Sequence, residues 1–448
     1  MDEVESIPDR IVTQELWNNE RWWYKLAHVC RRWRHLILAS ASHLHLHLVC
    51  TYDTPVADML AHSPHLPLII DYFHGNRDIS TEDGEGIALA LQHHDRVRLI
   101  RLMMPFPSLQ EPIKAIDEEF PILECLCIMP LTKPNTSLVL PKTLQAPHLR
   151  YLLLGNFTSP IGSPLLSTVV NLITLILGDI HILSSADFHP NDILQRLSLL
   201  PQLQTLWFNF HSFITNHDVE RQLLHTPVVT HATLPNLRRF AFGGASAYLE
   251  ALLPHMTTPV LERLRIEFFS QFSFSIPHLP QFLSTIENIR FSSATLTFDE
   301  SVFVSVYPHV GAEIDSLSMR VRCRDLNWQV ASVAQILDEL RIVSSVVECL
   351  TLDYRRDSIS PEWHNEADRS QWRELLRPFS KVKLLRVPDS LVGAISRSLQ
   401  PEEGESPLEV LPELEELSCS RSSNTRDPFT VFIDSRRIAG HPVSLVDL

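Results

Sequence analysis

A short spacing of aliphatic residues recurs along most of the chain and constrains its fold more than any other feature. In each copy, one aliphatic residue is followed by a second three positions later and by a third two positions after that, as in Leu149, Leu152 and Leu154. On a short strand the second and third residues share one face, because side chains two positions apart point the same way. The copies start 23 to 35 residues apart, at Val97, Leu123, Leu149, Leu172, Leu203, Leu237, Leu261, Ile286, Ile314, Val347, Val382 and Leu414. The pattern predicts a series of small similar units, each with one strand.

Segments with helical periodicity lie between these copies. Residues 190–200 carry Ile193, Leu197 and Leu200 on one side, and residues 327–343 show the same spacing. Aliphatic residues three and four positions apart lie on one face of an α-helix. The sequence therefore predicts that short strands and amphipathic helices alternate.

The alternation resembles the leucine-rich repeat, in its long and irregular α/β form, from about residue 96 to residue 448. The resemblance implies an α/β solenoid (a horseshoe) in which each unit buries its core against its neighbours. The Asn or Cys that regular repeats carry three residues after the last leucine is replaced, for example by Phe157 and Ala245. We therefore expect irregular units whose turns satisfy their backbone groups individually. A compact α/β domain with ordinary strands and helices is the alternative.

Composition narrows the possible partners and compartments. The 448 residues are 44% hydrophobic and 20% charged, with a formal net charge of −15. Such an acidic chain is poorly suited to bind nucleic acid or an anionic membrane, so we expect neither as a partner. The seven cysteines are scattered within apolar runs, which favours reduced thiols in an intracellular compartment, cytoplasmic or nuclear. The longest apolar stretch, residues 165–177, is too short to span a membrane, and the acidic start is unlike a signal peptide.

A segment rich in tryptophan lies near the start of the chain. Residues 22–38 predict a helix with one apolar stripe, formed by Trp22, Leu26, Val29, Trp33 and Ile37. One tryptophan can bury up to about 250 Å², which is worth several kcal/mol at about 25 cal/mol per Å². Because so short a segment cannot enclose this surface by itself, the helix must pack on the rest of the chain or on another protein.

The opening of the chain resembles an F-box. The matching positions are Ile7, Pro8 and Asp9, followed by Leu26, Val29, Cys30, Arg31, Arg32 and Trp33. The resemblance implies that residues 1–42 form an F-box-like helical element whose apolar face is completed by the Skp adaptor. Residues 43–95 would then be connecting strands and a loop that lead into the repeat array. The adaptor-binding residues that it implies are Ile7, Pro8, Leu26, Val29, Cys30 and Trp33.

The whole chain resembles the expanded F-box-like proteins of mushroom-forming fungi, in which this element precedes degenerate leucine-rich repeats. The resemblance implies a substrate-recognition subunit of a cullin–RING ubiquitin ligase. Such a subunit binds the Skp adaptor through its first element and a protein target through its repeats, and performs no chemistry itself. One alternative is a leucine-rich-repeat scaffold or binding protein unrelated to ubiquitin. Another is that the tryptophans only cap the open end of the repeat core.

Motifs for catalysis and metal binding are weak. His43, His45 and His47 alternate, but no nearby Cys or carboxylate pair completes the four ligands that zinc requires. No nucleophile elbow, Walker loop or zinc-protease motif is present. We therefore expect no enzyme activity, metal or cofactor. An enzyme would need a site assembled from distant loops.

The residues between the aliphatic positions point away from the predicted core and form the candidate target-binding surface. In the middle copies many of them are arginines, and Arg386 follows later. The predicted target-binding residues are Arg239, Arg263, Arg265, Arg290 and Trp207. Arg239 and Arg290 are expected one unit before and one unit after Arg263, so that four guanidinium groups converge. The strip would suit an acidic or phosphorylated protein segment, unless neighbours such as Glu262, Glu267 and Asp353 neutralise it. In the early copies the corresponding positions are apolar, as at Leu99, Cys125 and Tyr151.

Overall fold

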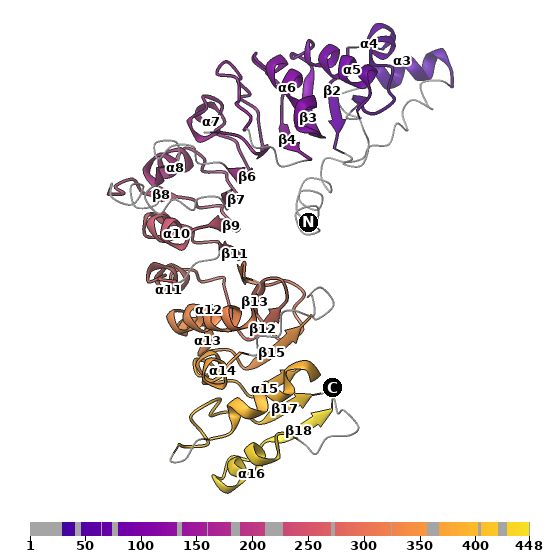
Figure 1. Ribbon diagram of the computed structural model, residues 1–448. Coiled ribbons are helices and arrows are strands. Elements are labelled where there is room, and N and C mark those ends of the chain that lie inside the picture. Colours follow the sequence, from indigo (N-terminus) through magenta and orange to yellow (C-terminus); the bar gives the residue numbers. More distant parts are fainter. Residues whose placement is uncertain are drawn as a thin grey trace. The chain divides into compact units, whose positions relative to one another are not determined.

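The protein divides into two compact units, Met1–Leu183 (unit 1) and Ser184–Leu448 (unit 2). The structure is a computed structural model (Figure 1). It describes residues 29–40, 46–63, 65–73, 79–131, 137–158, 160–180, 189–210, 227–269, 274–323, 325–355, 367–401, 405–419 and 428–447.

Parallel strands that pair in chain order form the sheet in the described part of unit 1. They are β1 (Leu48–Cys50), β2 (Leu68–Tyr72), β3 (Val97–Met104), β4 (Cys125–Pro130), β5 (Tyr151–Gly155) and β6 (Thr174–Ile180). The second and third aliphatic residues of each copy are buried, as Leu126 and Ile128 of β4 illustrate. The segment 43–95, expected to lead into the array, contributes β1 and β2 to this same row of strands.

Helices connect most of these strands, because parallel neighbours require a connection that returns the chain to the same end of the sheet. They are α4 (Val56–His62), α5 (Thr81–Leu91), α6 (Phe106–Ala115), the short helix α7 (Leu165–Thr168) and the 3₁₀ turn η1 (Pro160–Gly162). Helix α5 begins at a capping box, in which Ser80 and Asp83 each accept a hydrogen bond from the other's backbone N–H. Its buried residues Ile87 and Leu91 lie one turn apart and form the apolar stripe.

The predicted helix at residues 22–38 is only partly correct. Residues 22–28 lie outside the described part of the chain, and the described helix α3 runs over Arg31–Ala39. Cys30 has an extended backbone, and its Sγ accepts a hydrogen bond from the N–H of Trp33 at 3.5 Å. Because Cys30 is the N-cap, Val29 precedes the helix and the apolar stripe does not continue through it.

Unit 2 contains a longer row of strands in which one region departs from chain order. The strands are β7 (Thr205–Phe210), β9 (Arg239–Gly244), β11 (Arg263–Phe268), β12 (Ser293–Phe298), β13 (Val302–Tyr307), β14 (Leu317–Val321), β15 (Cys349–Tyr354), β16 (Leu384–Val387), β17 (Glu416–Cys419) and β18 (Ser444–Asp447). They pair in the order β7-β9-β11-β14-β13-β12-β15-β16-β17-β18. The short strands β8 (Ala232–Thr233) and β10 (Met256–Thr257) form a separate parallel pair.

The departure is a three-stranded meander, which the repeat pattern did not predict. Strand β13 pairs antiparallel with both β12 and β14, and β14 rather than β12 pairs with β11. The copy expected at Ile286, Ile289 and Phe291 forms no strand, because the chain turns there after α11 and β12 begins only at Ser293. The other eleven copies place their second and third residues on strands.

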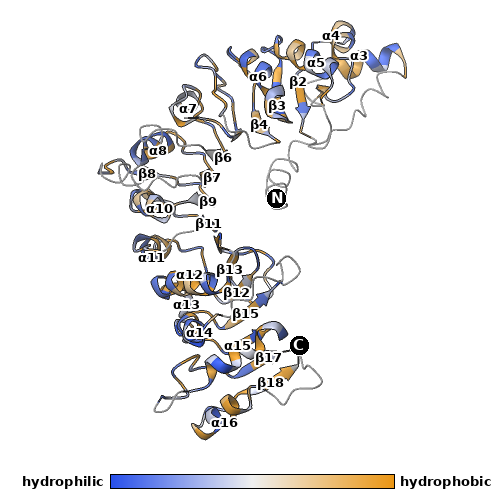
Figure 2. Cartoon of the chain, viewed as in Figure 1, coloured by the Kyte–Doolittle hydropathy of each residue, from blue (hydrophilic) through white to orange (hydrophobic). Residues whose placement is uncertain are grey.

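The helices of unit 2 pack beside the strands, and their buried side chains complete the hydrophobic core. They are α8 (Pro190–Leu197), α10 (Ser246–Leu252), α11 (His278–Ser284), α12 (Leu326–Glu339), α13 (Arg341–Ser344), α14 (Arg369–Leu376), α15 (Asp389–Leu399), α16 (Thr430–Ile438) and the 3₁₀ turn η2 (Leu253–His255). Hydrophilic and hydrophobic residues alternate along α12 (Figure 2). Trp372 of α14 is fully buried and meets Phe298 of β12 edge to face, with ring centroids 5.3 Å apart. A buried ring of this size stabilises the contact between helix and sheet by several kcal/mol, at about 25 cal/mol per Å².

The predicted alternation of strand and helix is therefore confirmed within each unit, and the fold class is α/β. The parallel rows, each strand returning through a helical connection, are consistent with an irregular leucine-rich-repeat solenoid.

Candidate binding surface

Strands β7, β9 and β11 of unit 2 have one face turned toward helices and one partly exposed face (Figure 1). Helices α8, α10 and α11 lie on one side of β7, β9 and β11 (Figure 1). Along β11 the residues alternate, so that Leu264 and Ile266 are buried whereas Arg263 and Arg265 are partly exposed. This alternation follows from the two-residue period of a strand. We call the partly exposed side the open face of unit 2.

A basic patch lies on the open face where β7, β9 and β11 meet. Arg239 and Arg263 are directly opposite each other in the parallel register, and Arg265 is opposite Ala241. Trp207 of β7 is also opposite Ala241 and is partly exposed. Neighbouring strands lie about 4.8 Å apart, so these side chains share a small area. We define the basic patch as Trp207, Arg239, Arg263 and Arg265, four of the five predicted target-binding residues.

The two opposed arginines repel each other. Partial burial lowers the pKa of Arg263 below its ordinary value, and the charge of Arg239 lowers it further, while Asp315 and Glu262 act in the opposite direction. Glu262 forms its ion pair with Arg238. Like charges directly opposite on neighbouring strands are destabilising, so the pair favours an added anion.

Glu267, the second expected neutralising residue, is occupied elsewhere. It pairs with Arg322 and lies 3.8 Å from Arg320 of β14. Arg320 also donates two hydrogen bonds to the Ser301 hydroxyl, and its Cζ lies 4.8 Å from the centre of the Phe303 ring. Within the described residues, Arg239 and Arg263 have no ion pair with either glutamate.

The expected position of Arg290 is wrong. Arg290 precedes β12, and β12 is separated from β11 by β14 and β13. The meander therefore places Arg290 three strands from Arg263 instead of one. Four guanidinium groups do not converge as predicted, and the patch contains three.

The corresponding face of unit 1 is buried, so its apolar strip is not an accessible surface. Val49, Ile69, Leu99 and Cys125 form one buried row across β1 to β4, and Tyr151 packs against it. The row follows the strand register. The apolar positions of the early copies therefore do not form an exposed binding surface.

A buried ion pair lies beside this apolar row. Arg101 of β3 donates three hydrogen bonds to the carboxylate of Asp71 on β2, at 3.0 to 3.1 Å. The two side chains are only 5% and 2% exposed. The ring of Phe73 lies 4.8 Å from the Arg101 Cζ. A charge pair withdrawn this far from water acts in folding and not as a surface for partners.

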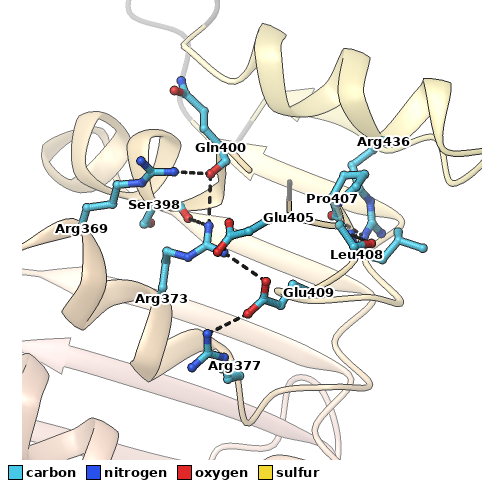
Figure 3. Close-up of polar contacts among 11 residues, drawn as sticks. Arg369, Arg373, Arg377, Ser398, Gln400, Glu405, Pro407, Leu408, Glu409 and Arg436 are labelled. Carbon is cyan, nitrogen blue, oxygen red and sulfur yellow. Dashed lines mark hydrogen bonds and ion pairs between the residues drawn. The ribbon is translucent and has the colours of Figure 1, made fainter. Parts of the chain in front are cut away.

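A second group of arginines, on α14, is already neutralised (Figure 3). Arg373 is buried, and it bonds Glu405 at 2.7 Å and the carbonyl oxygen of Gln400 at 3.1 Å. Arg377 pairs with Glu409 at 2.8 Å. These ion pairs hold the chain after α15 to α14 and to Arg377, which follows it.

The predicted adaptor-binding residues are only partly visible. Ile7, Pro8 and Leu26 lie outside the described residues. Val29 and Trp33 are 63% and 48% exposed, and Cys30 is exposed while it caps α3. Leu36, one turn after Trp33, is also exposed. Sequence reasoning missed Leu36, although the helical spacing from Trp33 could have identified it.

Histidine and cysteine side chains give no sign of metal binding in the described part of the chain, which holds no group of three or more potential ligands. His43 and His45 lie outside it, and His47 precedes β1. Burial raises the pKa of the Cys125 and Cys323 thiols to about 12 and about 11. Such thiols are protonated at neutral pH and are poor nucleophiles.

Three comparisons with known proteins gave one similar structure to report. No protein-family model matches the chain, and no curated protein matches it. Among solved structures, the chain is similar to the leucine-rich repeat-containing protein LegL7 from Legionella pneumophila, with 11% identity and a TM-score of 0.28. That match covers 89% of this chain and 99% of LegL7. Among the described helices, none has the length and apolar character needed to cross a membrane.

Proposed function

We propose that the protein is a binding module whose open face in unit 2 recognises an acidic or phosphorylated segment of a protein target. The observation that carries this proposal is the opposed pair Arg239 and Arg263, which repel each other while Glu262 pairs with Arg238. Guanidinium groups bind carboxylate and phosphate through two parallel hydrogen bonds, so an anionic segment would relieve the repulsion. Trp207 adds an apolar anchor of the kind that is common at interfaces.

Charge reversal tests this role. Arg239→Glu combined with Arg263→Glu should abolish binding of a labelled glutamate- and serine-rich peptide, measured by fluorescence anisotropy. Arg341→Glu combined with Arg437→Glu makes the same change in net charge at exposed helical positions and should leave binding intact. If both double variants bind equally well, the basic patch is not the target site.

We further propose that the protein is the substrate-recognition subunit of a cullin–RING ubiquitin ligase and contacts the Skp adaptor through the start of α3. The F-box resemblance and the exposed side chains of Val29, Trp33 and Leu36 support this. An exposed tryptophan flanked by aliphatic residues is a typical anchor for an interface that a partner completes. In this role the protein is not an enzyme, and the transfer of ubiquitin would be performed by other subunits.

Adaptor capture distinguishes this proposal from a leucine-rich-repeat scaffold unrelated to ubiquitin. Val29→Asp combined with Trp33→Ala should eliminate co-purification with recombinant Skp adaptor, because it removes an anchor and places a charge in the interface. Val431→Asp combined with Trp328→Ala is a matched control, since these residues are 59% and 52% exposed on other helices. Failure of the wild-type protein to bind the adaptor would leave the scaffold as the better description.

A further inference from the structure

A second polar site lies on the open face of unit 2, beyond the meander. A cavity of about 220 Å³ is lined by residues of β12 and β15. It has room for about seven water molecules. Its lining includes four residues that carry a hydroxyl group, the thiol residue Cys349 and one charged residue, Arg386; the four are Ser293, Thr295, Tyr307 and Thr351. No lining residue is acidic.

The strand register brings the hydrogen-bond donors together. Thr295, Thr351 and Arg386 are directly opposite one another on the parallel strands β12, β15 and β16. Because neighbouring strands lie about 4.8 Å apart, the backbones of Thr295 and Arg386 are about 10 Å from each other. The long side chain of Arg386 can span part of this distance. Burial raises the pKa of the Cys349 thiol, whereas the charge of Arg386 and a hydrogen bond with the Thr351 side chain lower it, so Arg386 and Thr351 both act on this residue of the lining.

A turn of fixed geometry forms the wall of the cavity. The N–H of Ala312 donates to the carbonyl of His309 at 3.2 Å, and Gly311 has a φ of +82°. A positive φ at the third position of a turn favours glycine, because other residues are strained there. The Ser293 hydroxyl donates to the same His309 carbonyl at 3.4 Å, which attaches the turn to β12.

Arg386 is the charged residue of the cavity lining. Arg386 has no ion pair within the described part of the chain, and Glu416, the acid that acts on Cys349, is not in the lining. A guanidinium beside several hydroxyl donors is complementary to an oxyanion. A phosphate monoester offers three strong acceptor oxygens and a charge of about −1.5 to −2, whereas a carboxylate offers two oxygens and one charge.

We propose that this cavity binds the phosphate of a phosphorylated side chain in the target. The inference rests on the proposed function of the open face and adds that recognition depends on phosphorylation, with Arg386 as the phosphate ligand and Thr295 and Thr351 as donors. The basic patch then contacts other acidic residues of the same segment.

Small probes test the cavity separately from the basic patch. O-phosphoserine and inorganic phosphate, titrated into the full-length protein and followed by NMR, should bind with a Kd on the order of millimolar, as expected for such small ligands. Arg386→Met should weaken both at least tenfold, or about 1.4 kcal/mol. Thr351→Val, which preserves the shape of the side chain and removes the hydroxyl, should weaken the binding of both ligands less. Glu416→Gln should strengthen their binding, because it removes a nearby negative charge. Circular dichroism checks that each variant is folded. If Arg386→Met does not fold, Arg386→Lys takes its place, because lysine keeps the charge but lacks the planar guanidinium group.

The outcomes separate the two proposals. Arg341→Met is the matched control, because Arg341 is an exposed arginine outside both proposed sites, and it should leave phosphoserine binding unchanged. Equal binding by wild type and Arg386→Met overturns the cavity proposal, as does equal affinity for phosphoserine and glutamate. Phosphoserine binding that depends on Arg386, without any binding of acidic peptides to the basic patch, supports the cavity and refutes the proposed role of the patch.

Discussion

Removing the charge of Asp71 should destabilise unit 1 more than any surface substitution. Asp71→Asn keeps the shape of the side chain but leaves the buried guanidinium of Arg101 without the carboxylate that now accepts three hydrogen bonds. Breaking a buried ion pair from one side costs about 3 to 5 kcal/mol, because a charge is left in a medium that solvates it poorly. The row beside the pair is apolar, which supports a value within this range.

Native-state hydrogen exchange measures the effect directly. Each 1.4 kcal/mol is a factor of ten, so amides in β2 and β3 that exchange by unfolding of unit 1 should exchange about 100 to 4,000 times faster. Asp338→Asn is the control, because Asp338 and Arg341 form an exposed pair whose loss costs less than about 1 kcal/mol. Amides of unit 2 should exchange unchanged in Asp71→Asn.

A double substitution distinguishes charge burial from lost packing. Asp71→Val combined with Arg101→Met removes both charges and keeps apolar volume, and buried pairs replaced in this way are often neutral or more stable. We expect the double variant to recover most of the stability lost in Asp71→Asn. The reasoning is refuted if Asp71→Asn costs no more than Asp338→Asn, or if the double variant is as unstable as the single one.

Four further results are expected. Binding of an acidic peptide to the basic patch should weaken as ionic strength rises to about 0.15 M, where charges are screened within about 8 Å; salt-insensitive affinity would contradict an electrostatic site. A chelator should leave the Tm unchanged, and a large shift accompanied by released zinc would overturn the interpretation of His43, His45 and His47. Burial raises the pKa of Cys125 from 9.0 to about 12 in the folded state, so its contribution to stability is complete below pH 9 and is lost between pH 9 and 12. The free energy of unfolding of unit 1, measured by denaturant titration, should therefore fall by about 1.4 kcal/mol per pH unit in that window. This pH-dependent decrease should be missing in Cys125→Ala. Native Cys125 should also resist a thiol reagent at pH 8 that labels the unfolded chain, and rapid native labelling would contradict its burial.

The sequence alone determined the repeating strands and the neighbourhood of three arginines. The aliphatic spacing encodes strands locally, because a residue's face on a strand depends only on its position modulo two. Arg239 and Arg263 occupy equivalent places in consecutive copies, and consecutive parallel strands that pair in register bring such places together. Trp207 and Arg265 follow from the same rule.

Tertiary structure decided everything that depends on which strands pair and on what covers them. Residues 293–298 and 302–307 have the alternation of a hairpin, but only long-range pairing inserts β14 beside β11 and moves Arg290 away from the patch. The pairing of β12 with β15, and of β15 with β16, places Thr295 beside Thr351 and Arg386 and so creates the cavity. Leu99 and Arg263 occupy equivalent positions in their copies, yet one is buried and the other partly exposed. Burial depends on neighbours far along the chain, and a local periodicity contains no information about them.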